Sequence, residues 1–183
     1  MPELYRRIQA YGSLSVVGIA GYHYYWQFVT YMFIHGNFQH VLFNMIALLA
    51  FGMNLERVIG SKEFVLFYFV TGILDGVLSY VIYRFTGQHY VMLMGASGAI
   101  YAVLFAYAVV FPRSIIFIWG LIPVPAPILV LLYAIIEFCS EFFGIRANVG
   151  HLTHLFGFLF AWLYFVIRIG MHPLKVWKNT FNR

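Results

Sequence analysis

Gly95-Ala96-Ser97-Gly98, followed by the apolar run from Ala99 to Phe111, is the stretch around which this sequence is organised. A short loop of small residues leads into an apolar helix, so Ser97 lies at the first turn, where backbone N–H groups have no partner within the helix. The two flanking glycines would let neighbouring backbone approach this serine closely. The pattern suits an accessible nucleophile. It equally suits a plain contact between two membrane helices, which need small residues to touch.

The composition is that of a membrane protein. The chain has 183 residues, of which 63% are hydrophobic and 9% are charged, and this leaves too little polar surface to cover a water-soluble globule. Because a spanning helix needs roughly 20 apolar residues, the length allows five or six helices in one bundle and no separate soluble domain. The net charge of +5 is spread along the chain without a basic stripe, so no nucleic-acid partner is expected. The single cysteine, Cys139, excludes an internal disulfide.

Five apolar segments predict membrane helices. They cover about residues 38–55, 64–83, 99–111, 126–142 and 152–169. The third segment is short and ends at Pro112, because proline cannot donate the next helical hydrogen bond. Residues 115–121 and 123–127 then predict an apolar connector packed against the bundle, because the three alternating prolines cannot continue a helix.

Three regions follow from this pattern. We expect an interfacial N-terminal segment over residues 1–37, where aromatic side chains favour the headgroup level, a transmembrane core over 38–170, and a basic cytoplasmic tail over 171–183. Five spans place the chain ends on opposite sides of the membrane. The side with the C-terminus would carry Arg57, Lys62, Arg113, Arg168, Lys175, Lys178 and Arg183, and the other side Arg6, Arg7, Arg84 and Arg146. The positive-inside rule then predicts a cytoplasmic C-terminus.

Ser97 needs a base, because an unassisted serine is inert near neutral pH. His154 is the best candidate, since Gly157 and Ala161 on the same helix form a smooth strip that lets another helix come close. If that neighbour is the helix of Ser97, the two side chains meet at one depth. Tyr101, one turn after Ser97, would then stack on the imidazole. The alternative is that His154 is simply a polar residue at a helix N-terminus.

Amide hydrolysis also needs donors for the oxyanion that forms in the transition state. His40 and Asn44 share one helical face near the same membrane depth, and with the backbone N–H of Ser97 they would supply two or three donors. The alternative for this pair is a set of interhelical hydrogen bonds.

Two further polar residues have no clear place in this scheme. Asp75 lies near the middle of its span, away from the helix ends, and is expected to be protonated, hydrogen-bonded to a neighbouring helix, or facing a wet cavity. His151 precedes His154 by three residues, which is half of a metal site. No carboxylate or cysteine completes it, so we expect no metal and no other cofactor.

Four motifs in this order resemble the rhomboid intramembrane serine protease family over about residues 26–162. The segment from His35 to Asn44 is similar to HxxxxHxxxN, and Glu56 with Gly60-Ser61 is similar to the ExxxGS turn. The segment from Gly95 to Tyr101 is similar to GxSGxxY, and His154 to Gly157 is similar to HxxG.

The resemblance implies an all-α, rhomboid-like membrane bundle that cuts peptide bonds in or near transmembrane segments of other proteins, with no metal or nucleotide. Ser97 would be the nucleophile, His154 the general base, and His40 and Asn44 the oxyanion donors. The supporting residues would be Tyr101, Gly95, Gly98, Gly157, Glu56 and His35. The partners would be transmembrane substrates and the lipid bilayer, and the oligomeric state stays open. We expect an integral multi-pass protein of a bacterial inner (plasma) membrane with its active site open to the outer side.

Three departures from the family pattern leave a second hypothesis open. The first of the usual six helices is missing or reduced, Trp26-Gln27 stands where Trp-Arg is usual and would leave Glu56 a neutral partner, and Ala161 stands where glycine is usual. The alternative function is a catalytically silent rhomboid-like protein that binds transmembrane helices. A small transporter has only Asp75 and the histidines in its favour.

Overall fold

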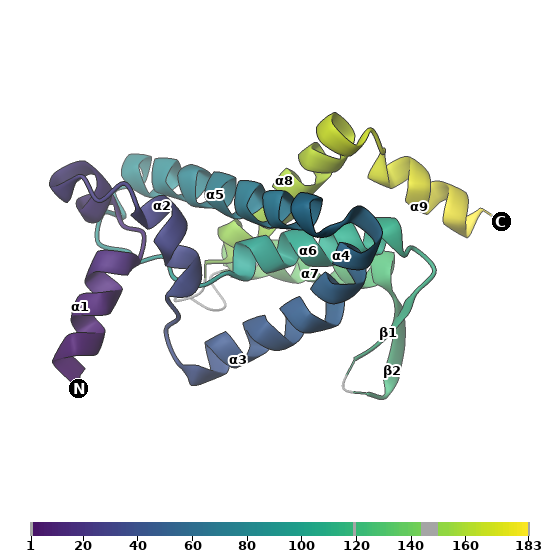
Figure 1. Ribbon diagram of the computed structural model, residues 1–183, viewed down its shortest axis with the longest axis horizontal. Coiled ribbons are helices and arrows are strands. Elements are labelled where there is room, and N and C mark those ends of the chain that lie inside the picture. The colour runs from purple at the N-terminus through teal and green to yellow at the C-terminus, as the bar shows by residue number, and fades with distance from the viewer. Residues whose placement is uncertain (1, 119, 144–149, 183) are drawn as a thin grey trace.

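Helix α6, Ser97–Val110, lies at the centre of the structure and is contacted by α5, α7 and α8 (Figure 1). The computed structural model describes residues 2–118, 120–143 and 150–182. In this part of the chain the helices are α1 Pro2–Gly12, α2 Gln27–Thr30, α3 Phe38–Ala47, α4 Met53–Ile59, α5 Ser61–Phe85, α6, α7 Ala126–Phe143, α8 His151–Tyr164 and α9 Pro173–Phe181, and the strands are β1 Ile115–Ile118 and β2 Ile122–Pro125. Arg146 and Arg183, which entered the charge count, lie outside the described residues.

The predicted all-α membrane fold is confirmed. Four helices of the described chain are long and apolar enough to cross a membrane: Phe38–Ile59, Ser61–Phe85, Ala126–Phe143 and His151–Ile169. The first is continuous through α3 and α4, which a π-helical turn at Leu48–Gly52 joins. A second π-helical turn, Phe165–Ile169, extends α8.

The fifth expected span, α6, is shorter than a membrane is thick. Its 14 residues make a helix about 21 Å long, against roughly 30 Å for the hydrocarbon core of a bilayer. Ten of these residues, including Ala102 and Val103, are buried, as expected for a helix that is apolar on all sides. Because neighbouring helices enclose it, α6 does not have to reach both faces of the membrane.

The apolar connector after α6 contains an antiparallel strand pair that the sequence analysis did not predict, in which residues 115–118 pair with residues 122–125. Ile116 pairs with Val124 and Ile118 with Ile122. Pro123 and Pro125 lack N–H groups, but Ile122 and Val124 keep theirs, so alternate positions of this strand can still pair. The hairpin extends away from the helices in Figure 1.

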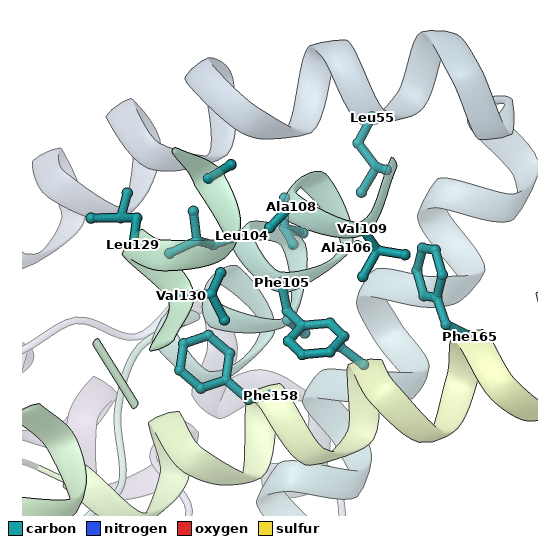
Figure 2. Packing of buried hydrophobic residues seen from close by; sticks show 14 of the residues in the cluster. Leu55, Leu104, Phe105, Ala106, Ala108, Val109, Leu129, Val130, Phe158 and Phe165 are labelled. Atoms are coloured by element: carbon teal, nitrogen blue, oxygen red, sulfur yellow. The ribbon is translucent and has the colours of Figure 1, made fainter. Parts of the chain in front are cut away.

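The hydrophobic core surrounds α6 and is drawn in Figure 2. Phe105 of α6 packs against Phe158 of α8, with ring centroids 6.2 Å apart. Leu129 and Val130 of α7 belong to the same cluster. The C-terminal helix α9 joins it through Trp177, whose indole N–H donates to the carbonyl of Ala108 at 2.9 Å. Residues 173–181 therefore form a helix that docks on the bundle.

A contact between backbone atoms joins α8 to α6 at Gly157. A Cβ atom at this position would overlap the carbonyl oxygen of Gly98 and lie 3.3 Å from the backbone nitrogen of Ala102. Since both neighbours are backbone atoms of a buried helix, neither can move without shifting α6. Gly157 therefore fixes the distance between the two helices.

We expect Gly157→Ala to lower the free energy of unfolding by about 1–3 kcal/mol, the usual cost of overpacking a tight core. Alanine has a higher helix propensity than glycine, so a loss of stability in this variant reports the contact between the two helices. Unfolding of the detergent-solubilised protein measures it. Gly21→Ala is the control, because its Cβ would meet only Val17 Cγ1 at 3.9 Å. Unchanged or greater stability of Gly157→Ala would contradict this account of the packing.

Candidate active site

Ser97 and His154 meet where α6 and α8 begin. Ser97 is the first residue of α6 and His154 lies in the first turn of α8. The Oγ atom of Ser97 and the Nε2 atom of His154 are 3.0 Å apart, at hydrogen-bond distance. His154 is 9% exposed, so the imidazole is almost enclosed. This is the geometry that a serine nucleophile and its base require.

The ring of Tyr101 stacks on the imidazole of His154. The two rings stack with centroids 4.2 Å apart and planes 5° from parallel. Tyr101 follows Ser97 by one turn of α6, so one helix carries both the hydroxyl and the ring that orients its partner. The sequence spacing predicted this stacking.

Glu137 is the residue of the site that the sequence analysis missed. It comes from α7, is 6% exposed, and its Oε1 atom lies 2.9 Å from Nδ1 of His154. The same oxygen accepts the Tyr101 hydroxyl at 2.5 Å, and Oε2 lies 2.5 Å from Nδ1 of His151. A signal was present, because a carboxylate inside an apolar span is a functional candidate by default; this rule was applied to Asp75 and not to Glu137.

His40 and Asn44 lie beside the loop that precedes Ser97. Gly95 in this loop has φ +108°, and a Cβ there would be 2.6 Å from Cε1 of His40 and 3.6 Å from Nδ2 of Asn44. Asn44 is 7% exposed, and its Nδ2 group has no hydrogen-bond partner among the described residues. The structure thus brings two side-chain donors next to the serine loop. Helix α3, which carries both, is capped by the Asn37 side chain, which accepts from the His40 N–H at 2.8 Å.

Comparison with known proteins identifies the family of this chain. Residues 22–170 match the family model described as the rhomboid domain. The chain belongs to the rhomboid family. It is 30% identical over 135 residues to "Putative rhomboid protease YdcA" of Bacillus subtilis, covering 73% of this chain and 62% of that protein. It is also 27% identical over 176 residues to RHOMBOID-like protein 4 of Arabidopsis thaliana, covering 96% of this chain and 42% of that protein. This rhomboid chain therefore spans roughly two fifths to three fifths of these relatives.

His35 lies next to His40. Its ring lies edge-on to that of His40 with centroids 5.1 Å apart, and Nε2 is buried without a partner among the described residues. Burial lowers the pKa of His35 below its usual value. The N-terminal helix α1 contacts the same segment, because Tyr5 donates its hydroxyl to the His35 carbonyl at 2.7 Å.

Asp75 does not belong to the Ser97–His154 pair. Asp75 is fully buried in α5, and its Oδ2 is 3.3 Å from the hydroxyl of Tyr31. Its carboxylate packs against Gly98, where a Cβ would overlap it. Of the expectations for Asp75, a hydrogen bond is the one observed, but the partner belongs to the 3₁₀ turn Tyr31–Phe33 rather than to another span.

The expected pairing of Gln27 with Glu56 is wrong. The buried Gln27 amide donates to the carbonyls of Ala10 and Tyr11 at 3.1 and 3.2 Å and accepts from the Ser15 N–H at 3.2 Å. It therefore holds the N-terminal segment together. Glu56 lies in α4 and lines a shallow hollow beside the turn to α5.

The premise used against a metal site is also wrong. Glu137 supplies the missing carboxylate, and its ligand atom and those of His151 and His154 lie within 4.8 Å of one another. However, the 2.5 and 2.9 Å contacts of Glu137 to the two imidazoles are shorter than the separation of about 3.3 Å expected between two ligands on a tetrahedral zinc ion. The observed geometry is that of a hydrogen-bonded carboxylate.

We expect Gly95→Ala to destabilise this rhomboid by about 1–3 kcal/mol, because the new methyl group collides with the His40 ring. The measurements are unfolding in detergent and the NMR signals of the His40 ring. Gly87→Ala is a matched control, since Gly87 also has positive φ, at +76°, but has nothing within 4 Å of its Cβ position. Equal losses of stability with unchanged His40 signals would show that the loop does not support His40.

Proposed function

We propose that this rhomboid is an intramembrane serine endopeptidase that hydrolyses peptide bonds in or near transmembrane segments of other membrane proteins. The observation that carries the proposal is the 3.0 Å contact between Ser97 Oγ and His154 Nε2 within a rhomboid domain. Ser97 Oγ attacks the carbonyl carbon while Nε2 of His154 takes the hydroxyl proton. The imidazolium then donates this proton to the leaving amine, and a water molecule activated in the same way releases the acyl group.

His40, Asn44 and the backbone N–H of Ser97 are the proposed donors for the oxyanion. The unpartnered Nδ2 group of Asn44 supports this role, because a buried donor without a protein acceptor is available to a charge that forms only during the reaction. The Ser97 N–H adds the positive end of a helix, since α6 begins at this residue and Ala96 provides no side-chain cap.

The proposal also covers the partners of the protein, its orientation, its regions and its membrane. The partners are transmembrane protein substrates and the bilayer, with the C-terminus in the cytoplasm and the site open to the outer side. The distribution of basic residues supports this orientation. The region boundaries stay as expected from the sequence, at 1–37, 38–170 and 171–183. The proposed location is a bacterial inner (plasma) membrane, and the apolar helices support a membrane location.

We expect Ser97→Ala and His154→Ala each to reduce cleavage of a model transmembrane substrate in liposomes by about 10⁴-fold or more, because nucleophile and base act as one unit. A fluorophosphonate probe should label the wild-type serine and not Ser97→Ala. Ser114→Ala and His172→Ala are the controls, since Ser114 bonds to the Phe111 carbonyl beyond the far end of α6 and His172 precedes α9. Both controls should cleave normally.

Two outcomes would overturn the proposal. Cleavage that survives either Ser97→Ala or His154→Ala would remove its mechanism. A wild-type protein that binds the substrate helix but is neither labelled nor active, under conditions that label an active rhomboid, would make it a silent helix-binding protein.

We expect Asn44→Ala to lower kcat by about 10²–10³-fold, the usual loss when one oxyanion donor is removed. KM should change little, because the donor acts on a charge absent from the bound substrate. Steady-state cleavage assays measure both constants. Asn54→Ala is the matched control, because the Asn54 amide donates to the Ala50 carbonyl at 3.1 Å within its own helical segment. An equal loss in the two variants would argue against an oxyanion role.

A further inference from the structure

We propose that Glu137 is a positioning residue that fixes the orientation and the tautomer of His154, so that a serine, a histidine and a glutamate act in series. The inference rests on the proposed function. The inference adds a third residue to the Ser97–His154 pair. Glu137 comes from a different helix, α7, and lies in none of the four sequence motifs.

The first argument is the proximity of the three groups. The imidazole of His154 has one nitrogen at 3.0 Å from Ser97 Oγ and the other at 2.9 Å from Glu137 Oε1. A carboxylate accepts and does not donate, so it favours the tautomer with the proton on Nδ1. The lone pair of Nε2 then faces the serine hydroxyl. This is the tautomer that a general base needs, and it is the one that a carboxylate selects in serine hydrolases of other folds.

The second argument is that Glu137 is itself held in place. Tyr101 donates its hydroxyl to Oε1, and His151 contacts Oε2 through Nδ1. The carboxylate is 6% exposed, so water competes little for its oxygens and the hydrogen bonds keep their full strength. Tyr101 thus has two contacts with this network, since its ring stacks on His154 and its hydroxyl binds Glu137.

The third argument concerns charge during the reaction. When His154 takes the serine proton it becomes an imidazolium inside a largely apolar bundle, which is costly without a compensating charge. Glu137 provides that charge at the distal nitrogen. Its effect is therefore larger in the transition state than in the resting enzyme, and this predicts an effect on kcat rather than on KM.

The test compares three variants of the full-length protein. Glu137→Gln keeps the shape of the side chain but can place an amide N–H against Nδ1, so we expect kcat to fall by about 10³–10⁴-fold with little change in KM. Glu137→Asp keeps the carboxylate and should recover a large part of this loss. Glu141→Gln, the same exchange one turn further along α7 at an exposed position, should match the wild type.

NMR of protein carrying ¹⁵N-labelled histidine separates a positioning role from a merely structural one. The wild type should show His154 protonated at Nδ1, and Glu137→Gln should shift its proton to Nε2 while the unfolding transition stays the same. The inference is overturned if Glu137→Gln cleaves like the wild type, if the tautomer does not change, or if Glu137→Asp is no more active than Glu137→Gln.

A chelator distinguishes this role from a zinc site made by the same side chains. We expect EDTA to leave cleavage unchanged; loss of activity that added zinc restores would assign Glu137, His151 and His154 to a metal and overturn the positioning role. Failure of the proposed function looks different, because the wild type itself would then neither cleave the substrate nor react with the fluorophosphonate probe.

Discussion

The contact between α6 and α8 is the constraint on which the site depends. At Gly157 the two helices touch through backbone atoms, since a methyl group there would overlap the Gly98 carbonyl. His154 lies on the same face of α8 as Gly157, three residues earlier. On α6, Ser97 directly precedes Gly98. A side chain of ordinary size at the contact would push the helices apart, and a separation increased by one ångström is enough to break a 3.0 Å hydrogen bond. The glycine is therefore as much a part of the site as the two reacting groups.

The polar groups of the site compensate one another across three helices. Helix α6 carries Ser97 and Tyr101, α7 carries Glu137, and α8 carries His151 and His154. In an apolar bundle an unpaired carboxylate is costly, and removing one member leaves the others unsatisfied. The Glu137 oxygens meet one hydroxyl and two imidazoles instead, so the network that would orient the proposed base also links α7 to the other two helices.

How far the sequence predicted this structure depends on whether the signal was local. The helix ends agree to within a few residues where proline, glycine or a change in polarity marks them, as at Pro112 after α6 and Gly60 before α5. The stacking of Tyr101 on His154 followed from helical spacing and one small-residue strip. Glu137 did not, because nothing in the sequence states which face of α7 meets α8. The same limit explains Gln27, whose partners in residues 10–15 are set by the fold of the N-terminal segment.

The short length of α6 bears on how the proposed hydrolytic site would obtain water within a membrane protein. A helix of 14 residues covers about two thirds of the hydrocarbon thickness, so if its C-terminal end lies near one face, Ser97 lies below the other. Water at that depth must bind to polar groups of the protein. The end of the bundle near Ser97 provides them, because Nε2 of His35 and Nδ2 of Asn44 have no hydrogen-bond partner among the described residues. The short helix therefore places Ser97, the proposed nucleophile, at a depth where unpartnered side-chain donors of the bundle suit both a water molecule and the proposed oxyanion.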